Sequence, residues 1–352
     1  MQPLPSRGQL FFFAVLLPAL VAGSNQLLFE IVPTFPGLRI ALYPWMAFSI
    51  AVLSWSAGGY LSPAWLRWGV FAWCLILLDM LTISACLTHR TEMHFGHMMV
   101  AAQISLIVLW TVLARGNWQW RMPLGLVAAA ALIVFASTFR SYWGAPDWNL
   151  LMIVTSLVIL LVCGAIRISG FALQQLAGDT SGWSEYHSLK TTQFGLKHML
   201  IWATSLVPIL LVMRGLDFFV LKKLGGPDLF PFVLVALVVA TANLIAIWTV
   251  LGQGRLFVRL FALLLIPFLL AATMSQYLAH IESTYRVTLQ TRRGQIYQDY
   301  SRAWYNSLVN GIVEGRDSWA SWLWLDAALL AALLLFLRAS GYRLMRKAGT
   351  TG

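Results

Sequence analysis

The stretch Leu229–Leu251 reads LFPFVLVALVVATANLIAIWTVL and contains no charged residue. Hydrocarbon about 30 Å thick is crossed by about 20 apolar residues of α-helix, because each residue adds about 1.5 Å of length. The run is continuous and lacks the apolar–polar alternation of a strand in a membrane barrel. It therefore predicts a transmembrane helix.

Nine other windows along the chain have the same character. They are Leu10–Phe29, Ile40–Leu61, Trp68–Leu87, Met98–Leu113, Met122–Thr138, Leu150–Ile168, Leu196–Met213, Arg259–Leu278 and Trp322–Leu337. The chain is 59% hydrophobic and 11% charged, whereas soluble domains are about 45–50% apolar and about 25% charged. The predicted fold class is all-α: a polytopic helical integral membrane protein with about ten transmembrane helices, embedded in a lipid bilayer.

The basic residues predict the orientation of these helices. With the N-terminus inside, thirteen of the 24 Lys and Arg residues fall in inside segments, and six fall in short outside loops. This asymmetry favours both termini in the cytoplasm. The net charge of +11 is thus explained by membrane topology and does not indicate nucleic acid. We place the chain in a cell (inner) membrane of the bacterial type.

Three regions divide the chain. Residues 1–278 are expected to form a membrane bundle of about nine spans, and residues 279–321 an extracytoplasmic amphipathic helical segment. Residues 322–352 are expected to form the last transmembrane helix and a basic cytoplasmic tail, which anchors against anionic lipid headgroups. The inside segment Ser169–Phe194 has a turn-rich polar centre, so we expect a loop with room for one interfacial turn of helix.

The outer segment suggests a binding surface. Apolar and aromatic residues recur there at every fourth position, which is the spacing of one helical face. Arg286, Arg293, Tyr300 and Arg302 are the candidates for contacting a partner or an anionic or glycan ligand. The alternative is an amphipathic helix that rests at headgroup level, where Tyr and Trp are naturally enriched.

Asp79 lies near the centre of the third window, in LILLDMLTIS. An ionised side chain there costs at least a few kcal/mol, so it faces protein or water. One hypothesis is a coupling-ion or proton site. The other is a hydrogen-bonded aspartate that joins helices, with Gln103 or Asn243 as its partner. Asp326, about one turn inside the last window, is expected to reach water at the outer interface.

The outer turn between the third and fourth windows is THRTEMHFGH, Thr88–His97, with three of the six histidines. His89, Glu92, His94 and His97 have side chains that bind zinc, and histidine can also ligate haem. The spacing His-Glu-x-x-His is absent, so no metal or haem cofactor is predicted. The alternatives are the mouth of a protonatable pathway and a solvated turn.

One internal similarity is visible. His94–Gly116 aligns without gaps to Gln193–Gly215, with Phe-Gly at the start and Arg-Gly at the end of each. Copies three crossings apart would run in opposite directions, as in the inverted repeats of some transporters.

Nucleotide and acyl-transfer motifs are absent: the sequence has no phosphate-binding Walker loop, dinucleotide fingerprint or serine nucleophile elbow. We therefore expect a transporter or permease-like protein with an intramembrane aspartate, rather than an enzyme. The alternatives are a non-catalytic scaffold or sensor, and an enzyme that acts on a lipid-linked substrate. A protein partner or a homo-oligomer is compatible with each of these functions.

Overall fold

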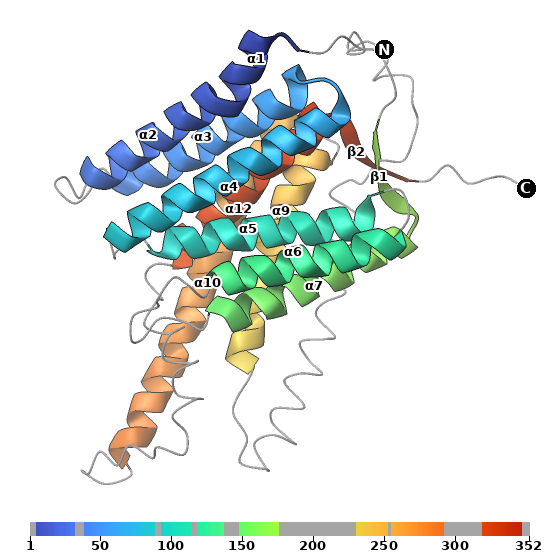
Figure 1. The fold of residues 1–352 in the computed structure, drawn as a ribbon. Helices are drawn as coiled ribbons and strands as arrows, with labels where there is room; N and C mark the ends of the chain where they lie inside the picture. The colour runs from blue at the N-terminus through green and yellow to red at the C-terminus, as the bar shows by residue number, and fades with distance from the viewer. Residues whose placement is uncertain are drawn as a thin grey trace, which may run out of the picture.

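The computed structural model describes residues 5–31, 39–88, 93–114, 118–136, 148–175, 230–252, 255–291 and 319–346. Helices make up nearly all of these residues (Figure 1). In chain order they are α1 (Arg7–Phe11), a π-helical turn (Phe12–Leu16), α2 (Leu17–Ile31), α3 (Arg39–Tyr60), α4 (Ala64–Thr88), α5 (Met93–Leu113), α6 (Trp118–Ala136), α7 (Trp148–Ile168), α9 (Phe230–Leu251), α10 (Leu256–Thr291) and α12 (Trp319–Ala339).

Seven helices in the described ranges are long and apolar enough to cross a membrane, which agrees with a helical membrane protein. They cover Arg7–Ile31, Phe95–Leu113, Gln119–Ala136, Leu151–Ile168, Val233–Leu251, Leu256–His280 and Trp319–Ala339. Helices α3 and α4 coincide with two further predicted windows. The window Leu196–Met213 lies outside the described residues, so the count of about ten stays a prediction.

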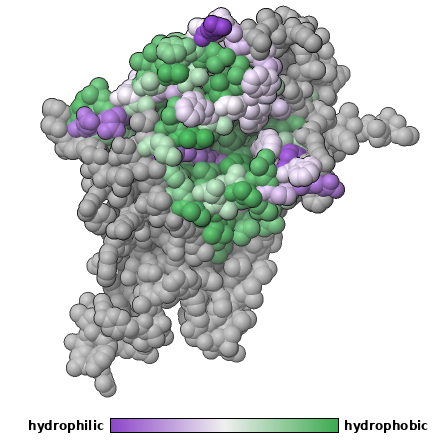
Figure 2. Space-filling model, viewed as in Figure 1, coloured by the Kyte–Doolittle hydropathy of each residue, from purple (hydrophilic) through white to green (hydrophobic). Residues whose placement is uncertain are grey.

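The exposed surface of the bundle is apolar, as contact with lipid requires. On α6, Leu124, Leu126 and Val127 are exposed, and on α10 so are Phe257 and Phe268. Figure 2 shows hydrophobic surface gathered over the N-terminal helices and again over α6 and α7. Exposure of such a surface to water is unfavourable in free energy, whereas contact with lipid hydrocarbon is not.

Helix α12 lies at the centre of the molecule and packs against α3, α5, α9 and α10. It lies close to α3 at Gly58, where an added Cβ atom would come within 2.5 Å of the Phe336 carbonyl oxygen. Small residues of this kind allow the backbones of membrane helices to approach each other. The N-terminal helices α2, α3 and α4 thus form a layer that contacts the rest through α12 and, from α4, through α5.

Two short strands cap one end of the bundle. β1 (Phe171–Gln175) pairs antiparallel with β2 (Tyr342–Arg346), and Leu173 faces Leu344 at the centre of the register. In Figure 1 the pair lies where α7 and α12 end. The prediction of a loop after Ser169 is therefore wrong at Phe171–Gln175. A five-residue strand is too short to show a clear alternating pattern, and its partner lies far away in the sequence.

Helix α10 is longer than its predicted window. It continues without a break from Leu256 to Thr291, so its C-terminal part extends beyond the other helices (Figure 1). The start of the predicted outer segment, up to Thr291, is therefore a continuation of this helix rather than a separate one. Arg286 lies in that continuation.

Candidate functional site

A sequence pattern at two helix ends identifies an internal repeat. Helix α5 ends in WTVLARG (Trp110–Gly116), and α9 ends in WTVLGQG (Trp248–Gly254); an arginine follows each glycine by five residues. Arg121 donates from Nη1 to the carbonyl oxygens of Trp110 and Ala114. Arg259 does the same to the carbonyl oxygens of Thr249, at 2.9 Å, and Gly252, at 3.0 Å. Each arginine thus satisfies the last carbonyl groups of the preceding helix, which have no partner within it.

A second pattern lies at the ends of α7 and α12, where each helix leads into a strand. RISGFAL (Arg167–Leu173) ends α7 and begins β1, and RASGYRL (Arg338–Leu344) ends α12 and begins β2. Arg167 Nη1 donates to the Val112 carbonyl oxygen at 2.8 Å, and Arg338 Nη1 donates to the Val250 carbonyl oxygen at 2.8 Å. The two valines occupy the same place in the WTVL pattern.

Two repeated units, called the halves below, therefore share one arrangement, and the N-terminal helices α1–α4 belong to neither. The first half is α5, α6, α7 and β1, and the second half is α9, α10, α12 and β2. The glycine before each strand has positive φ, 88° at Gly170 and 87° at Gly341, a conformation that glycine adopts without steric cost. Each of these glycines also donates its N–H to the carbonyl oxygen of the arginine three residues earlier.

Equivalent residues of the two halves meet each other. Leu173 pairs with Leu344 in the sheet, and the Asn243 Nδ2 amide donates to Ser105 Oγ at 3.2 Å. Residues that contact their own equivalents lie on the two-fold axis that relates the copies. α7 and α12 run directly into the paired strands, and α5 and α9 end beside them. The halves are thus a parallel repeat. The predicted inverted copy, Gln193–Gly215, lies outside the described residues.

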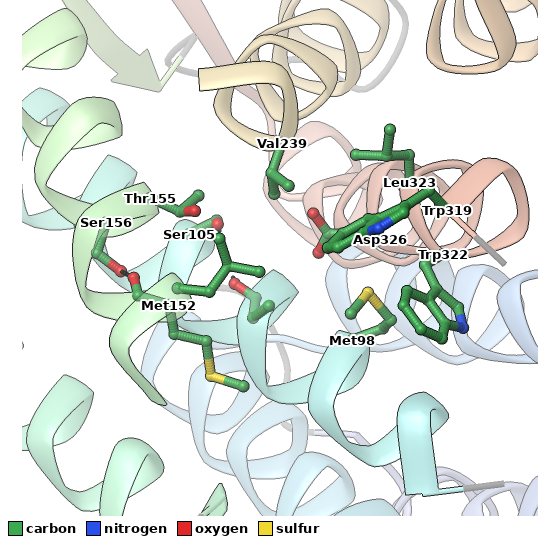
Figure 3. Close-up of a pocket in the computed structure, with 12 residues that line it drawn as sticks. Met98, Ser105, Met152, Thr155, Ser156, Val239, Trp319, Trp322, Leu323 and Asp326 are labelled. Atoms are coloured by element: carbon green, nitrogen blue, oxygen red, sulfur yellow. Dashed lines mark hydrogen bonds between the residues drawn. The ribbon is translucent and has the colours of Figure 1, made fainter. Parts of the chain in front are cut away.

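A cavity lies beside the Ser105–Asn243 contact, between α5, α7, α9 and α12 (Figure 3). About 20 Å³ of it can be occupied by the centre of a water-sized sphere, which is room for about one water molecule or one small ion. Its walls are Met98, Ala101, Ser105, Leu151, Met152, Thr155, Ser156, Val239, Trp319, Trp322, Leu323 and Asp326.

Asp326 and Thr155 face this cavity and occupy equivalent positions in α12 and α7. They are 1% and 4% exposed. Figure 3 shows the Asp326 carboxyl pointing from α12 toward the wall that carries Ser105 and Thr155. Among the described residues, neither carboxyl oxygen nor Thr155 Oγ1 has a hydrogen-bond partner. Buried polar atoms are nearly always paired, so these oxygens are the candidate ligands of the cavity.

Asn243 completes the polar cluster. Its side-chain amide lies close to the Asp326 carboxyl, but outside hydrogen-bond geometry, and its own Oδ1 has no partner in the described part of the chain. Asp326 was expected to reach water at the outer interface, and that expectation is wrong. Neighbouring helices bury it, which its depth along one helix could not show.

Asp79 belongs to a different cluster. Gln103 Nε2 donates to Asp79 Oδ1 at 2.8 Å, which joins α4 to α5, and Asp79 is 9% exposed. Of the two partners of Asp79 that the sequence suggested, Gln103 and Asn243, Gln103 is therefore the one that binds it. The intramembrane candidates separate into two groups on different faces of α5: Asp79 with Gln103, and Asn243 with Ser105 and Asp326.

The histidine stretch is described only in part. His97 lies in α5 and is 3% exposed, so it belongs to the packed interior rather than to a solvated turn. His94 also lies in α5, and its side chain is outside the described residues, as are His89 and Glu92. Where the structure describes side chains, no group of three or more His, Cys, Asp or Glu could hold a metal ion.

The outer binding candidates are not brought together by the described residues. Arg286 lies in α10, and its side chain is outside the described part. Arg293, Tyr300 and Arg302 lie outside it entirely.

Comparisons with protein-family models, curated proteins and solved structures find no match for this chain. The fold and the site therefore define the class by themselves: a helical protein with membrane-spanning helices, whose two parallel halves enclose a buried carboxyl. The sequence analysis did not propose Thr155 and Ser105 as candidate site residues, and it placed Asp326 at the water interface instead of at a cavity. The repeated WTVL and Arg-x-Ser-Gly patterns are the sequence signal that could have found them.

Proposed function

We propose that this protein is a membrane transporter of the permease type, in which reversible neutralisation of Asp326 accompanies the movement of a solute. The observation that carries the proposal is the pair of unpartnered, buried carboxyl oxygens of Asp326 at a cavity on the axis between the halves. An ionised carboxylate inside a membrane helix costs about 2.5–3.5 kcal/mol or more. Binding of a positively charged ion or solute offsets that cost, and release of the ion or solute restores the cost.

The position of the cavity supports the same function. Transporters built from repeats hold their substrate and coupling ions near the bilayer midplane, at the interface of the repeats. Here the interface contains Ser105 and Asn243 from the two halves, and Asp326 lies next to them. Relative movement of the halves would therefore change the surroundings of the carboxyl group.

We further propose that both termini lie in the cytoplasm and that the membrane is a cell (inner) membrane of the bacterial type. The orientation is supported by six arginines that donate to backbone carbonyls at the end of the bundle where the strands pair. They are Arg67, Arg121, Arg167, Arg259, Arg338 and Arg343. A concentration of basic residues at one end is typical of the cytoplasmic side.

The test is gradient-driven uptake into proteoliposomes. The wild-type protein, Asp326→Asn and the control Ser54→Ala would be reconstituted, and a panel of radiolabelled amino acids, sugars and carboxylates offered under an inward proton or sodium gradient. Ser54 suits the control because its buried hydroxyl also has no partner among the described residues, yet it does not line the cavity.

We expect uptake of at least one solute by the wild type and unchanged uptake by Ser54→Ala. In Asp326→Asn we expect a loss of about tenfold or more, since the variant lacks the charge that the coupling cation neutralises. Gradient-driven uptake that is equal in Asp326→Asn would refute the role of this carboxyl. No uptake of any solute by the wild type would count against transport.

A further inference from the structure

We infer that the cavity between Asp326 and Thr155 binds one sodium ion that has lost most of its hydration shell. The role of this ion in coupling rests on the transport function proposed above, but the binding itself does not. The inference is built from the chemistry, charge and size of the site.

The unpartnered groups of the cavity are oxygens. Asp326 contributes two carboxyl oxygens and Thr155 contributes its hydroxyl oxygen. Ser105 Oγ, which also lines the cavity, donates to the Ala101 carbonyl oxygen and accepts from Asn243. Carboxylate, hydroxyl and carbonyl oxygens are the ligands of hard cations. These oxygens stand in a largely apolar wall, and the group closest to the Asp326 carboxyl is the neutral Asn243 amide. An ionised Asp326 therefore has no cationic partner among the described residues, and a bound cation would supply one.

The charge of the site selects a monovalent ion. Asp326 is the one carboxylate among the described residues that line the cavity. A monovalent cation neutralises it, whereas a divalent cation would leave a net positive charge in the membrane interior, at a cost of several kcal/mol. Calcium sites usually combine several carboxylates with other oxygens, and no second carboxylate is present on these walls.

The size of the cavity excludes a hydrated or organic cation. The space holds about one water-sized guest, and a bare sodium ion is smaller than a water molecule. Choline is far larger, so it serves as a non-binding substitute at equal ionic strength. A proton would neutralise Asp326 but would leave the cavity and the Thr155 oxygen unfilled.

The position of the ion also follows from the repeat. Asp326 and Thr155 are equivalent residues of the two halves, so an ion held by both lies close to the two-fold axis. Only the second half supplies the acid, and the first half supplies a neutral oxygen at the same place. The ion is thus bound by residues of both halves.

The experiment measures thermal unfolding of the full-length protein in detergent, with increasing NaCl replaced by choline chloride at constant ionic strength and pH. Binding of ²²Na⁺ by equilibrium dialysis of the same samples gives the affinity directly. The variants are Asp326→Asn, Thr155→Val and the control Ser54→Ala, each checked for helicity and for a single gel-filtration peak.

A ligand that binds only the folded state raises the unfolding temperature. We expect a saturable rise with sodium in the wild type and in Ser54→Ala, and no rise in Asp326→Asn. In Thr155→Val, which keeps the carboxyl, we expect an affinity about tenfold weaker. Thr155→Val keeps the test decisive if Asp326→Asn fails to fold.

Several outcomes would overturn the inference: no sodium-dependent rise in the wild type, an undiminished rise in Asp326→Asn, or wild-type affinity in Thr155→Val. Stabilisation that follows pH and ignores sodium would assign the site to a proton instead. Sodium binding without solute uptake in proteoliposomes would leave this site standing and defeat the transport proposal. Solute uptake without sodium binding would support the transport proposal and refute the sodium site.

Discussion

The two halves of the molecule keep the same framework but differ at the cavity. Both have an arginine that caps the first helix, an arginine that reaches across from the third helix, and a glycine with positive φ before a strand. Near the axis, by contrast, Ser105 and Thr155 of the first half correspond to Asn243 and Asp326 of the second. Residues that hold the helices together are shared, and residues that can bind a charged guest are not.

The largest expected effect comes from exchanging the acid across the axis. Asp326→Thr should lose the sodium-dependent rise in unfolding temperature completely. Adding Thr155→Asp in the same chain should restore it, with an affinity within about tenfold of the wild type, because both positions face one cavity. The measurement is the NaCl titration in detergent. A well-folded double variant without a sodium response would show that the two positions are not equivalent.

The next effect tests the framework. Arg167→Ala and Arg338→Ala each remove the arginine donor from one valine carbonyl at a helix end, Val112 and Val250, so each should lower the free energy of unfolding by about 1–3 kcal/mol. Unfolding by increasing mole fraction of sodium dodecyl sulfate would measure both. A loss in one variant and none in the other would mean that the halves do not use these arginines alike.

A smaller loss of stability, similar in both halves, is expected when the glycines before the two strands are substituted. Gly170→Ala and Gly341→Ala place a Cβ atom on a residue with φ near 88°, which costs about 1–2 kcal/mol. The matched control is Gly164→Ala in α7, where nothing lies within 4 Å of an added Cβ and where alanine is the better helix former. The same detergent titration should show a loss in the first two variants only. Equal stability of all three variants would contradict the turn geometry.

The smallest effect is expected at the other buried carboxyl. In Asp79→Asn the new side-chain oxygen can still accept from Gln103, so we expect a change in stability of less than about 1 kcal/mol. The sodium response should persist, because Asp79 does not line the cavity. Loss of the sodium response in this variant, with its retention in Asp326→Asn, would move the ion site to Asp79.

Much of the framework could be predicted from local sequence. Window length and apolar character placed the described helices, because both are properties of a continuous segment. Gln103 was a predictable partner of Asp79, since a polar group inside a membrane helix needs one. The two strands were not predictable in this way, because each is short and its partner is more than a hundred residues away in the sequence.

The site was harder to predict, for two physical reasons. The depth of Asp326 along α12 suggested that it reaches water, but packing by α5, α7 and α9 decides its burial, and one helix read alone does not show its neighbours. The repeat was obscured because α10 is longer than α6 and the connection between α10 and α12 is longer than that between α6 and α7. No single ungapped alignment therefore matches both the WTVL and the Arg-x-Ser-Gly patterns.

The strand pair lies at the end of the molecule about which one half could tilt relative to the other. It joins the halves through backbone pairing at one end, at the Leu173–Leu344 pair, whereas the start of α12 lies about 30 Å away along a helix that rises about 1.5 Å per residue. Between these points the halves meet through side chains, such as Asn243 and Ser105. A tilt of one half by about 10° about the strand pair would displace the far end by about 5 Å. A tilt of this kind would leave the strand pair in place and separate the halves most at the Trp319 end of α12.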